Sequence, residues 1–539
     1  MNLPRLFHTV KYLKPVQIYG RLWFKFYKPR PDMSLAPAIR SIKDNWLNSC
    51  KKNPSLLSPY CFRFLNKEHE LKSVKDWNNP RWEKLWLYNL HYFDDLQACD
   101  AENKKVLHLD LIGKWIKENP PAMGNGWEPY PSSLRIVNWI KWVLAGNGLS
   151  DEALHSLAVQ VRHLFKKTEI HLLGNHLIAN AKALIFAGLF FAGNEAEFWL
   201  NKGLKILSSQ VPEQILNDGG HFELSPMYHS IILEDILDLI NIMRTYDRTI
   251  PVIWLGSVEK MFFWLKVMCH PDKKMDFFND CAFGIAPDPM DLEQYAVRLG
   301  FPIVDSLRDG INQLSGSGYV RLQKGDAVLI ADVGKIGPDY LPGHAHADTL
   351  SFEFSYYGKR VFVNSGISCY GNSKERLLQR GTACHNTLVV DGKNSSEVWG
   401  GFRVAKRAYP LGLEVEDKKN QGLWIRCGHD GYTRLKGKPV HWREWCVKDN
   451  SLKIKDQVTG EFSEAQAFYH LYPGATVDLQ EKKILLDDIC IKFQTNAEFF
   501  LKDTCYYPEF GKVVPNKCLV LKPLNNQYFI KFICHEGCD

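Results

Sequence analysis

Two histidines and an aspartate alternate between Gly343 and Asp348, just ahead of an apolar run. In an extended strand, residues two apart share a face, so His344, His346 and Asp348 are predicted to project together. Leu350, Phe352 and Phe354 would continue that face into a core. Imidazoles and carboxylates transfer protons or bind metal ions. The pattern therefore predicts a functional site at this strand end, with solvated surface histidines as the alternative.

A second cluster lies between Asn217 and His229. Ser225 is a good helix N-cap, and Pro226 suits the first helical position. Tyr228 then falls in the first turn, where the helix dipole favours negative charge and should ease ionisation of the phenol. We predict a proton-transferring tyrosine, and the alternative is an aromatic side chain packed beside a capped helix.

A third candidate is the pair Asn175 and His176, which opens an alanine-rich helix. A polar pair at a helix start can lie in a cleft, although Asn also caps helices without any further role.

A fourth candidate combines His346 with Asn364 and His385, each placed next to a predicted strand. Two imidazoles and an oxygen ligand suit Zn²⁺ when they converge. A hydrogen-bonded structural cluster is the alternative.

These residues need a scaffold, and the hydrophobic pattern predicts one in two parts. Apolar residues recur at spacings of three and four between residues 82 and 269, which is typical of roughly ten helices. After residue 315, short strands alternate with turns, which predicts an antiparallel sandwich. We therefore expect a helical domain over residues 1–312, irregular over residues 1–75, and a β-sandwich over residues 313–539.

Bulk composition narrows the function classes. The 539 residues carry 67 basic and 60 acidic side chains, a formal charge of +7, and no nucleic-acid-binding motif. The 14 cysteines lack paired metal-ligand spacing, and Cys534 to Cys538 suggests a loose C-terminal end. The start of the sequence does not resemble a signal peptide, and no apolar run is long enough to span a membrane. We expect a cytoplasmic location, with the periplasm as the alternative.

The order of these motifs resembles the heparinase II/III family of polysaccharide lyases, from about Trp86 to about Gly460. The resemblance rests on the Asn-His pair, the segment around Tyr228, the Gly-His-Ala-His-Ala-Asp stretch and the His-Asn-Thr sequence at His385. It implies an incomplete α/α toroid followed by an antiparallel β-sandwich.

The resemblance also implies roles for individual residues. Tyr228 matches a Brønsted acid that in many members is also the base. Asn175 and His344 match groups that neutralise the substrate carboxylate, and His176 shares that role or serves as base. Zinc-binding members have ligands at His346 and His385, but an aspartate where this chain has Asn364. Substrate contacts are expected from Trp127, Tyr130, Arg135, Glu223 and His229.

The implied activity is β-elimination on an anionic, uronate-containing polysaccharide or oligosaccharide, with structural zinc as the one candidate cofactor and no organic cofactor. A uronyl C5-epimerase would use the same proton abstraction. A glycoside hydrolase would need two carboxylates, for which Asp218 and Glu223 are candidates. A non-catalytic glycan-binding protein of surface-polysaccharide assembly is a further alternative. The oligomeric state stays open.

Overall fold

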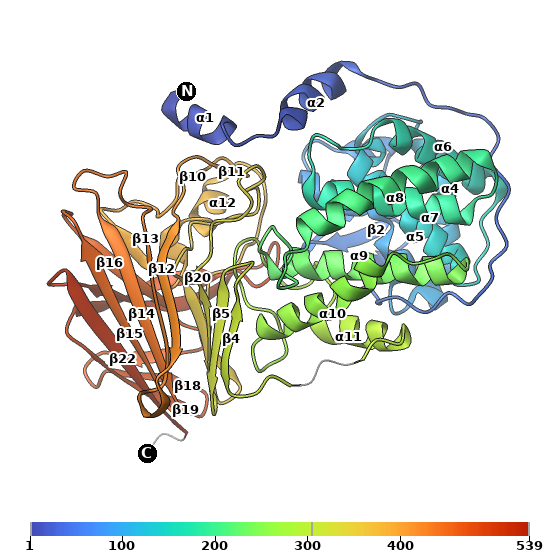
Figure 1. The fold of residues 1–539 in the computed structure, drawn as a ribbon. Helices are drawn as coiled ribbons and strands as arrows, with labels where there is room; N and C mark the ends of the chain where they lie inside the picture. The colour runs from blue at the N-terminus through green and yellow to red at the C-terminus, as the bar shows by residue number, and fades with distance from the viewer. Residues whose placement is uncertain (1–2, 303–305, 537–539) are drawn as a thin grey trace.

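The computed structural model describes residues 3–302 and 306–536 and contains a helical part followed by a β part (Figure 1). The first strand of the β part, β4, begins at Gly310. This order of a helical region and then antiparallel sheets agrees with the predicted fold class. Within the described residues, no helix is long and apolar enough to cross a membrane.

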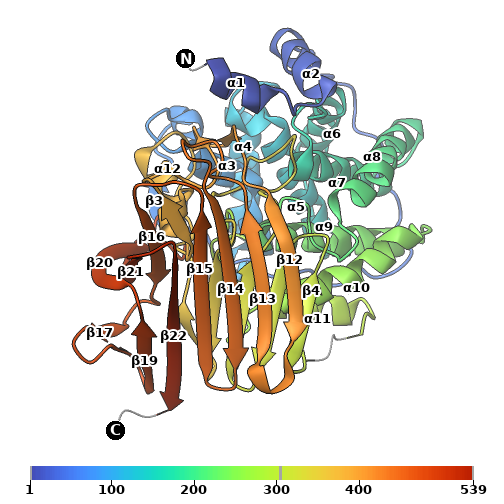
Figure 2. The ribbon, with the colours of Figure 1, turned by 60° about the vertical axis from the view of Figure 1, so that its left-hand side comes forward.

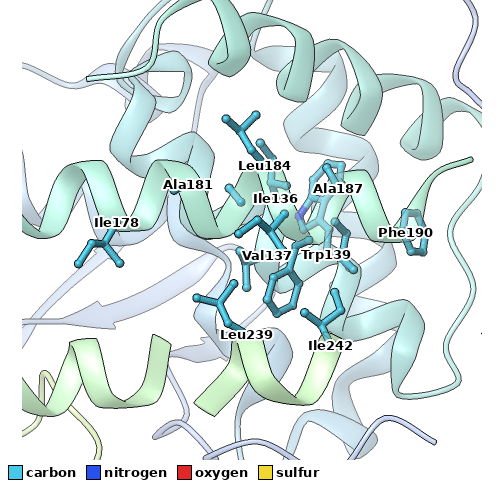
Figure 3. Packing of buried hydrophobic residues seen from close by; sticks show 14 of the residues in the cluster. Ile136, Val137, Trp139, Ile178, Ala181, Leu184, Ala187, Phe190, Leu239 and Ile242 are labelled. Carbon is cyan, nitrogen blue, oxygen red and sulfur yellow. The ribbon is translucent and has the colours of Figure 1, made fainter. Parts of the chain in front are cut away.

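The helical part is built from α3 to α11, which pack around one large apolar core. Side chains of α5, α7 and α9 interlock there, among them Trp139, Leu184 and Leu239 (Figure 3). Helices α7 and α8 approach closely, because a Cβ atom on Gly188 would lie only 2.5 Å from the Leu200 nitrogen. The helices are α3 (Lys84–Tyr92), α4 (Lys105–Glu118), α5 (Pro129–Leu144), α6 (Asp151–Lys166), α7 (Gly174–Phe190), α8 (Asn194–Gln214), α9 (Pro226–Thr245), α10 (Val252–Val267) and α11 (Pro289–Arg298).

The N-terminal segment is more regular than predicted. Helices α1 (Leu3–Val10) and α2 (Pro15–Phe26) precede a small antiparallel sheet. This sheet contains β1 (Leu56–Ser58), β2 (Cys61–Phe64) and β3 (Lys67–Glu70). Strands this short carry too little alternation to stand out in a sequence, and tertiary packing stabilises them: the Phe64 ring lies 5.2 Å from that of Trp86.

Three larger antiparallel sheets form most of the β part, beside the two-stranded pair of β10 (Val398–Trp399) and β11 (Arg403–Val404) (Figure 2). A five-stranded sheet and an eight-stranded sheet enclose a shared apolar core with residues such as Phe352, Ile425 and Phe532, and a four-stranded sheet closes its side. The five strands are β4 (Gly310–Leu314), β5 (Tyr319–Lys324), β6 (Ala327–Asp332), β7 (Phe352–Tyr356) and β8 (Lys359–Phe362). The eight are β12 (Pro410–Asp417), β13 (Leu423–His429), β14 (Val440–Lys448), β15 (Ser451–Thr459), β22 (Gln527–Glu536), β19 (Ile489–Thr495), β18 (Lys483–Leu486) and β17 (Thr476–Asp478). The four are β20 (Glu498–Tyr506), β21 (Val514–Lys522), β16 (Ala465–His470) and β9 (Leu388–Val390), while β10, β11 and α12 (Lys374–Gln379) belong to connecting segments.

Two local predictions in the β part were wrong. The stretch from His344 to Asp348 is an irregular loop, and the strand begins only at Phe352, because Leu350 takes a left-handed backbone with φ of +64°. The C-terminal end is not loose through residue 536, since His535 of β22 pairs with Cys490 of β19. Cys538 lies outside the described residues.

Candidate active site

A cleft of about 1700 Å³ is lined by residues from both parts of the molecule. The helical part contributes Asn175, His176 and Tyr228, and the β part contributes His344 and Tyr370. The four residues predicted to be catalytic therefore all line one cavity, although they come from segments far apart in the chain. Tyr130 and Glu223, two of the predicted substrate contacts, also line it.

The Glu223 side chain contacts residues from both the helical part and the β part. Asn175, at the N-terminus of α7, donates from Nδ2 to both carboxylate oxygens of Glu223 at 3.2 Å. Across the cleft, His344 Nε2 lies 3.5 Å from Glu223 Oε2. Asn175 of the helical part and His344 of the β part thus both contact the carboxylate of Glu223.

Tyr228 lies directly against His344. Their ring centroids are 3.9 Å apart, and the Tyr228 hydroxyl lies 2.9 Å from that of Tyr370. The predicted cap is present, because Ser225 Oγ accepts a hydrogen bond from the Tyr228 backbone nitrogen. The predicted ease of ionisation is wrong: burial, reinforced by Tyr370, raises the pKa of Tyr228 well above its usual value. Tyr228 is therefore a protonated phenol near neutral pH.

Asp280 binds both histidines of the loop from His344 to Asp348, which we call the histidine loop. It accepts a hydrogen bond from His344 Nδ1 at 2.8 Å and lies 2.8 Å from His346 Nε2. The Arg376 guanidinium binds both of its oxygens, the Oδ2 contact being 2.6 Å. Burial alone would raise the pKa of Asp280, but Arg376 and the two imidazoles hold it well below its usual range. An ionised Asp280 fixes the His344 ring so that Nε2 is the nitrogen turned toward Glu223.

His176 has a carboxylate partner of its own. Its Nδ1 lies 3.2 Å from Glu169 Oε2, and its ring lies 4.4 Å from that of Tyr130. Burial lowers the pKa of His176, but the charge and hydrogen bond of Glu169 outweigh it and leave this pKa raised. Because Glu169 holds Nδ1, the other ring nitrogen remains for chemistry.

Three of the predicted substrate contacts belong to the interior instead and do not line the cleft. Trp127 is 3% exposed and donates to the Asn119 carbonyl. Arg135 donates to the carbonyl oxygens of His91 and Gly126, so it ties helices together. His229 donates to the Met261 carbonyl. All three side chains already have internal partners that leave none of their polar groups for a sugar.

The predicted zinc ligands converge only in part. His346 Nδ1 lies 3.2 Å from His385 Nε2, a separation that two nitrogens on one tetrahedral zinc could also have. The Asn364 oxygen, however, already accepts a hydrogen bond from the Asn386 backbone. Within residues 3–302 and 306–536, no group of three or more His, Cys, Asp or Glu side chains is arranged to hold a metal ion. The two imidazoles converge while the Asn364 oxygen already has a protein donor, and zinc stays a prediction.

Sequence reasoning missed Tyr370, Asp280 and Arg376. Each is a single residue in a segment without a recognisable pattern, and only the tertiary fold brings it to the histidine loop. A weak signal existed for Asp280, since an acid between Asn279 and Cys281 in an otherwise apolar stretch must have a buried partner.

Two family models cover most of the chain. Residues 107–288 match the model described as "Heparinase II/III N-terminus", and residues 308–528 match "Heparinase II/III-like, C-terminal". The chain belongs to the heparinase II/III family. The two matched ranges coincide with the helical part and the β part that meet at the cleft.

The individual proteins that this chain matches are distant relatives. A heparin-sulfate lyase of Bacteroides stercoris is 28% identical over 50% of this chain and 44% of its own length. The chain spans about half the length of the heparin-sulfate lyases it matches. The FtsZ-localized protein C of Caulobacter vibrioides is 26% identical over 64% of this chain and 60% of its own length. The crystal structure of heparinase III superposes with a TM-score of 0.68 at 19% identity, covering 88% of this chain and 80% of that chain, which shows a shared fold.

Proposed function

We propose that this protein is a polysaccharide lyase that cleaves a uronate-containing glycan by β-elimination. One observation carries the proposal. Asn175 of the helical part and His344 of the β part contact one carboxylate position, occupied by Glu223, and the Tyr228 ring lies against that of His344. A uronate bound at that position would have its reacting carbons beside a proton donor.

The first chemical requirement is to stabilise charge on the substrate carboxylate. The proton on C5 of a uronate is weakly acidic until the neighbouring carboxylate is neutralised by hydrogen bonds or positive charge. Asn175 and His344 supply those hydrogen bonds. Glu223 marks their convergence in the free protein, and a proton shared between Glu223 and the bound uronate would remove the repulsion between two like charges.

The second requirement is a base for the C5 proton, and we assign this role to His176. The contact to Glu169 holds Nδ1 and leaves Nε2 to accept the proton. The raised pKa of His176 makes it a stronger base once the pH exceeds that value. The product of this step is an enolate-like intermediate held by Asn175 and His344.

The third requirement is an acid for the leaving oxygen on C4, and Tyr228 fits that role. Its raised pKa keeps the phenol protonated, and its contact to the Tyr370 hydroxyl gives a route by which the proton can be replaced. The C4–O bond breaks as Tyr228 donates its proton, and a C4–C5 double bond forms. Water is not consumed.

The cleft also has features that suit a sugar chain. The rings of Tyr92 and Tyr130, 6.0 Å apart, line its wall, and Phe402 of the β part also lines it. Aromatic faces pack against the apolar faces of sugar rings. These rings would hold the residues on either side of the cleaved bond.

A hydrolase is less well supported, because Asp218, one of its two candidate carboxylates, lies outside the cleft. Its carboxylate accepts hydrogen bonds from the Ser317 nitrogen and hydroxyl, and it does not line the cleft. A non-catalytic role is the second candidate, favoured by the relative whose name refers to FtsZ rather than to a lyase.

The test is to incubate the protein with a panel of uronate polysaccharides and record ultraviolet absorbance of the unsaturated product. We expect absorbance to rise with at least one glycan, and Tyr228→Phe, as a folded control, to abolish the rise. A glycan that binds tightly and is never cleaved by the folded wild-type protein would favour the non-catalytic candidate.

A further inference from the structure

The outer faces of α1 and α2 are unusually apolar for exposed helices. On α1, Leu3, Phe7 and Val10 are 74%, 65% and 40% exposed. Their spacing of four and three residues places them on one side of the helix. Both views of the ribbon show α1 and α2 on the outside of the molecule (Figure 1, Figure 2).

Helix α2 also exposes apolar side chains on its surface, and several of them are larger. Ile18, Tyr19, Leu22, Trp23 and Phe26 are all between 48% and 77% exposed, and they recur at one helical face. Exposed apolar side chains gathered on one face of a helix mark a surface that binds something. We call the exposed apolar side chains of α1 and α2 the N-terminal face.

The opposite side of the two helices is anchored to both parts of the molecule. Thr9 Oγ1 accepts a hydrogen bond from Trp399 Nε1 in the β part. Gln17 donates to the Tyr340 carbonyl, and the Phe24 ring stacks on that of His171 at 4.5 Å in the helical part. These contacts fix which side of α1 and α2 is turned outward, so the N-terminal face is a surface of the folded protein.

The charge of this segment is as distinctive as its apolar face. Of the 67 basic and 60 acidic residues in the chain, residues 1–30 hold seven Lys or Arg and no Asp or Glu. The rest of the chain is therefore formally neutral, and the whole net charge of +7 arises in this segment. Among these side chains, Lys11, Arg21, Lys25 and Lys28 are exposed.

We propose that the N-terminal face binds the surface of an anionic lipid bilayer. A helix pair with an apolar stripe, interfacial aromatics and flanking cations is suited to lie in the headgroup region. Trp23 and Tyr19 offer rings that prefer the membrane interface, and the exposed lysines would meet anionic headgroups. The long stems of those lysines let the ammonium groups reach the headgroups while the apolar residues insert.

The positive charge of residues 1–30 favours an anionic bilayer, rather than a second copy of this chain, as the partner of the N-terminal face. Two copies meeting through this face would bring two positive segments together, whereas an anionic membrane neutralises them. The inner side of α1 and α2 also lines the cleft, through residues such as Leu6 of α1 and Gln17 of α2. Binding there would place the cleft within reach of glycans that lie close to a membrane.

Vesicle co-sedimentation of the full chain tests the proposal. We expect binding to vesicles with about 30% phosphatidylglycerol, at least tenfold stronger than to pure phosphatidylcholine vesicles, and weakening as salt rises. The double variant Phe7→Asp/Leu22→Asp should bind at least tenfold more weakly. A matched control is Val252→Asp, whose side chain is 82% exposed at the start of α10 and whose binding should equal wild type.

A second variant, Lys25→Glu/Lys28→Glu, keeps the apolar face and should lose binding to the anionic vesicles. Circular dichroism and the melting temperature show that each variant is folded. Absence of vesicle binding by the folded wild-type protein would overturn the proposal, as would binding that both double variants retain. A lipid-free dimer that Phe7→Asp/Leu22→Asp dissociates would assign the face to a second copy instead.

Discussion

Replacing Asp280 with Asn should destabilise the protein strongly. Asp280 and Arg376 are both fully buried, and the carboxylate compensates the guanidinium while also binding His344 and His346. Removing one partner of a buried ion pair leaves an uncompensated charge and costs about 3–5 kcal/mol. Since Asn can still accept one hydrogen bond, we expect a loss of about 3 kcal/mol in the free energy of unfolding at pH 7.

Denaturant unfolding of Asp280→Asn, Arg376→Gln and the double variant measures this coupling. The double variant should lose less stability than the two single losses combined, because it removes both members of the pair. A surface control is Asp503→Asn, whose contact to Lys517 is exposed and should contribute less than about 1 kcal/mol. A loss below about 1 kcal/mol for Asp280→Asn, or strict additivity, would refute the electrostatic role of Asp280.

The difference in unfolding free energy between wild type and Asp280→Asn should depend on pH in a defined direction. The pKa of folded Asp280 is depressed, so its contribution to stability is present above the unfolded pKa of about 3.9. The contribution is lost as the pH falls from there toward the folded pKa. The stability gap between wild type and Asp280→Asn should therefore be constant near neutral pH and shrink below about pH 4.

Four further results are expected. Tyr228→Phe should keep the melting temperature and glycan binding but lose at least ~10²-fold in turnover, and near-full activity would refute its role as acid. Glu169→Gln removes the group that raises the pKa of His176, so the acidic limb of the pH–rate profile should move to lower pH; an unmoved limb argues against His176 as base. Trp127→Ala should lower the free energy of unfolding by about 3–5 kcal/mol and leave KM unchanged. A higher KM at unchanged stability would instead indicate that Trp127 contacts the substrate. Any zinc found at the two buried imidazoles by elemental analysis should be structural, so chelation that stops turnover in a protein still folded would contradict this expectation.

Local patterns predicted local structure well. Ser225 and Pro226 start α9 as their types require, and the change from helical to alternating spacing predicted the order of a helical part and a β part. The alternation of His344 and His346 predicted correctly that the two side chains lie close together, but the predicted strand is absent at these residues. They converge because Asp280 binds both rings, and no strand is involved.

Burial and contacts between distant segments could not be predicted from the sequence. The dipole argument for Tyr228 considered its own helix, while burial by several elements determines its pKa. Trp127 and Arg135 have side chains that could bind sugars, and only the packing of helices shows that they are internal. Tyr370 comes from a connecting segment whose path depends on the fold of the β part.

Product analysis after reaction in heavy water tests the central claim most directly. With a uronate glycan cleaved by the wild-type protein, we predict shorter chains that carry C4–C5 unsaturated ends and little deuterium at C5 of uncleaved polymer. Intact polymer with deuterium at C5 would show an epimerase, and saturated new ends would show a hydrolase. Either result would contradict β-elimination at the site formed by Asn175, Tyr228 and His344.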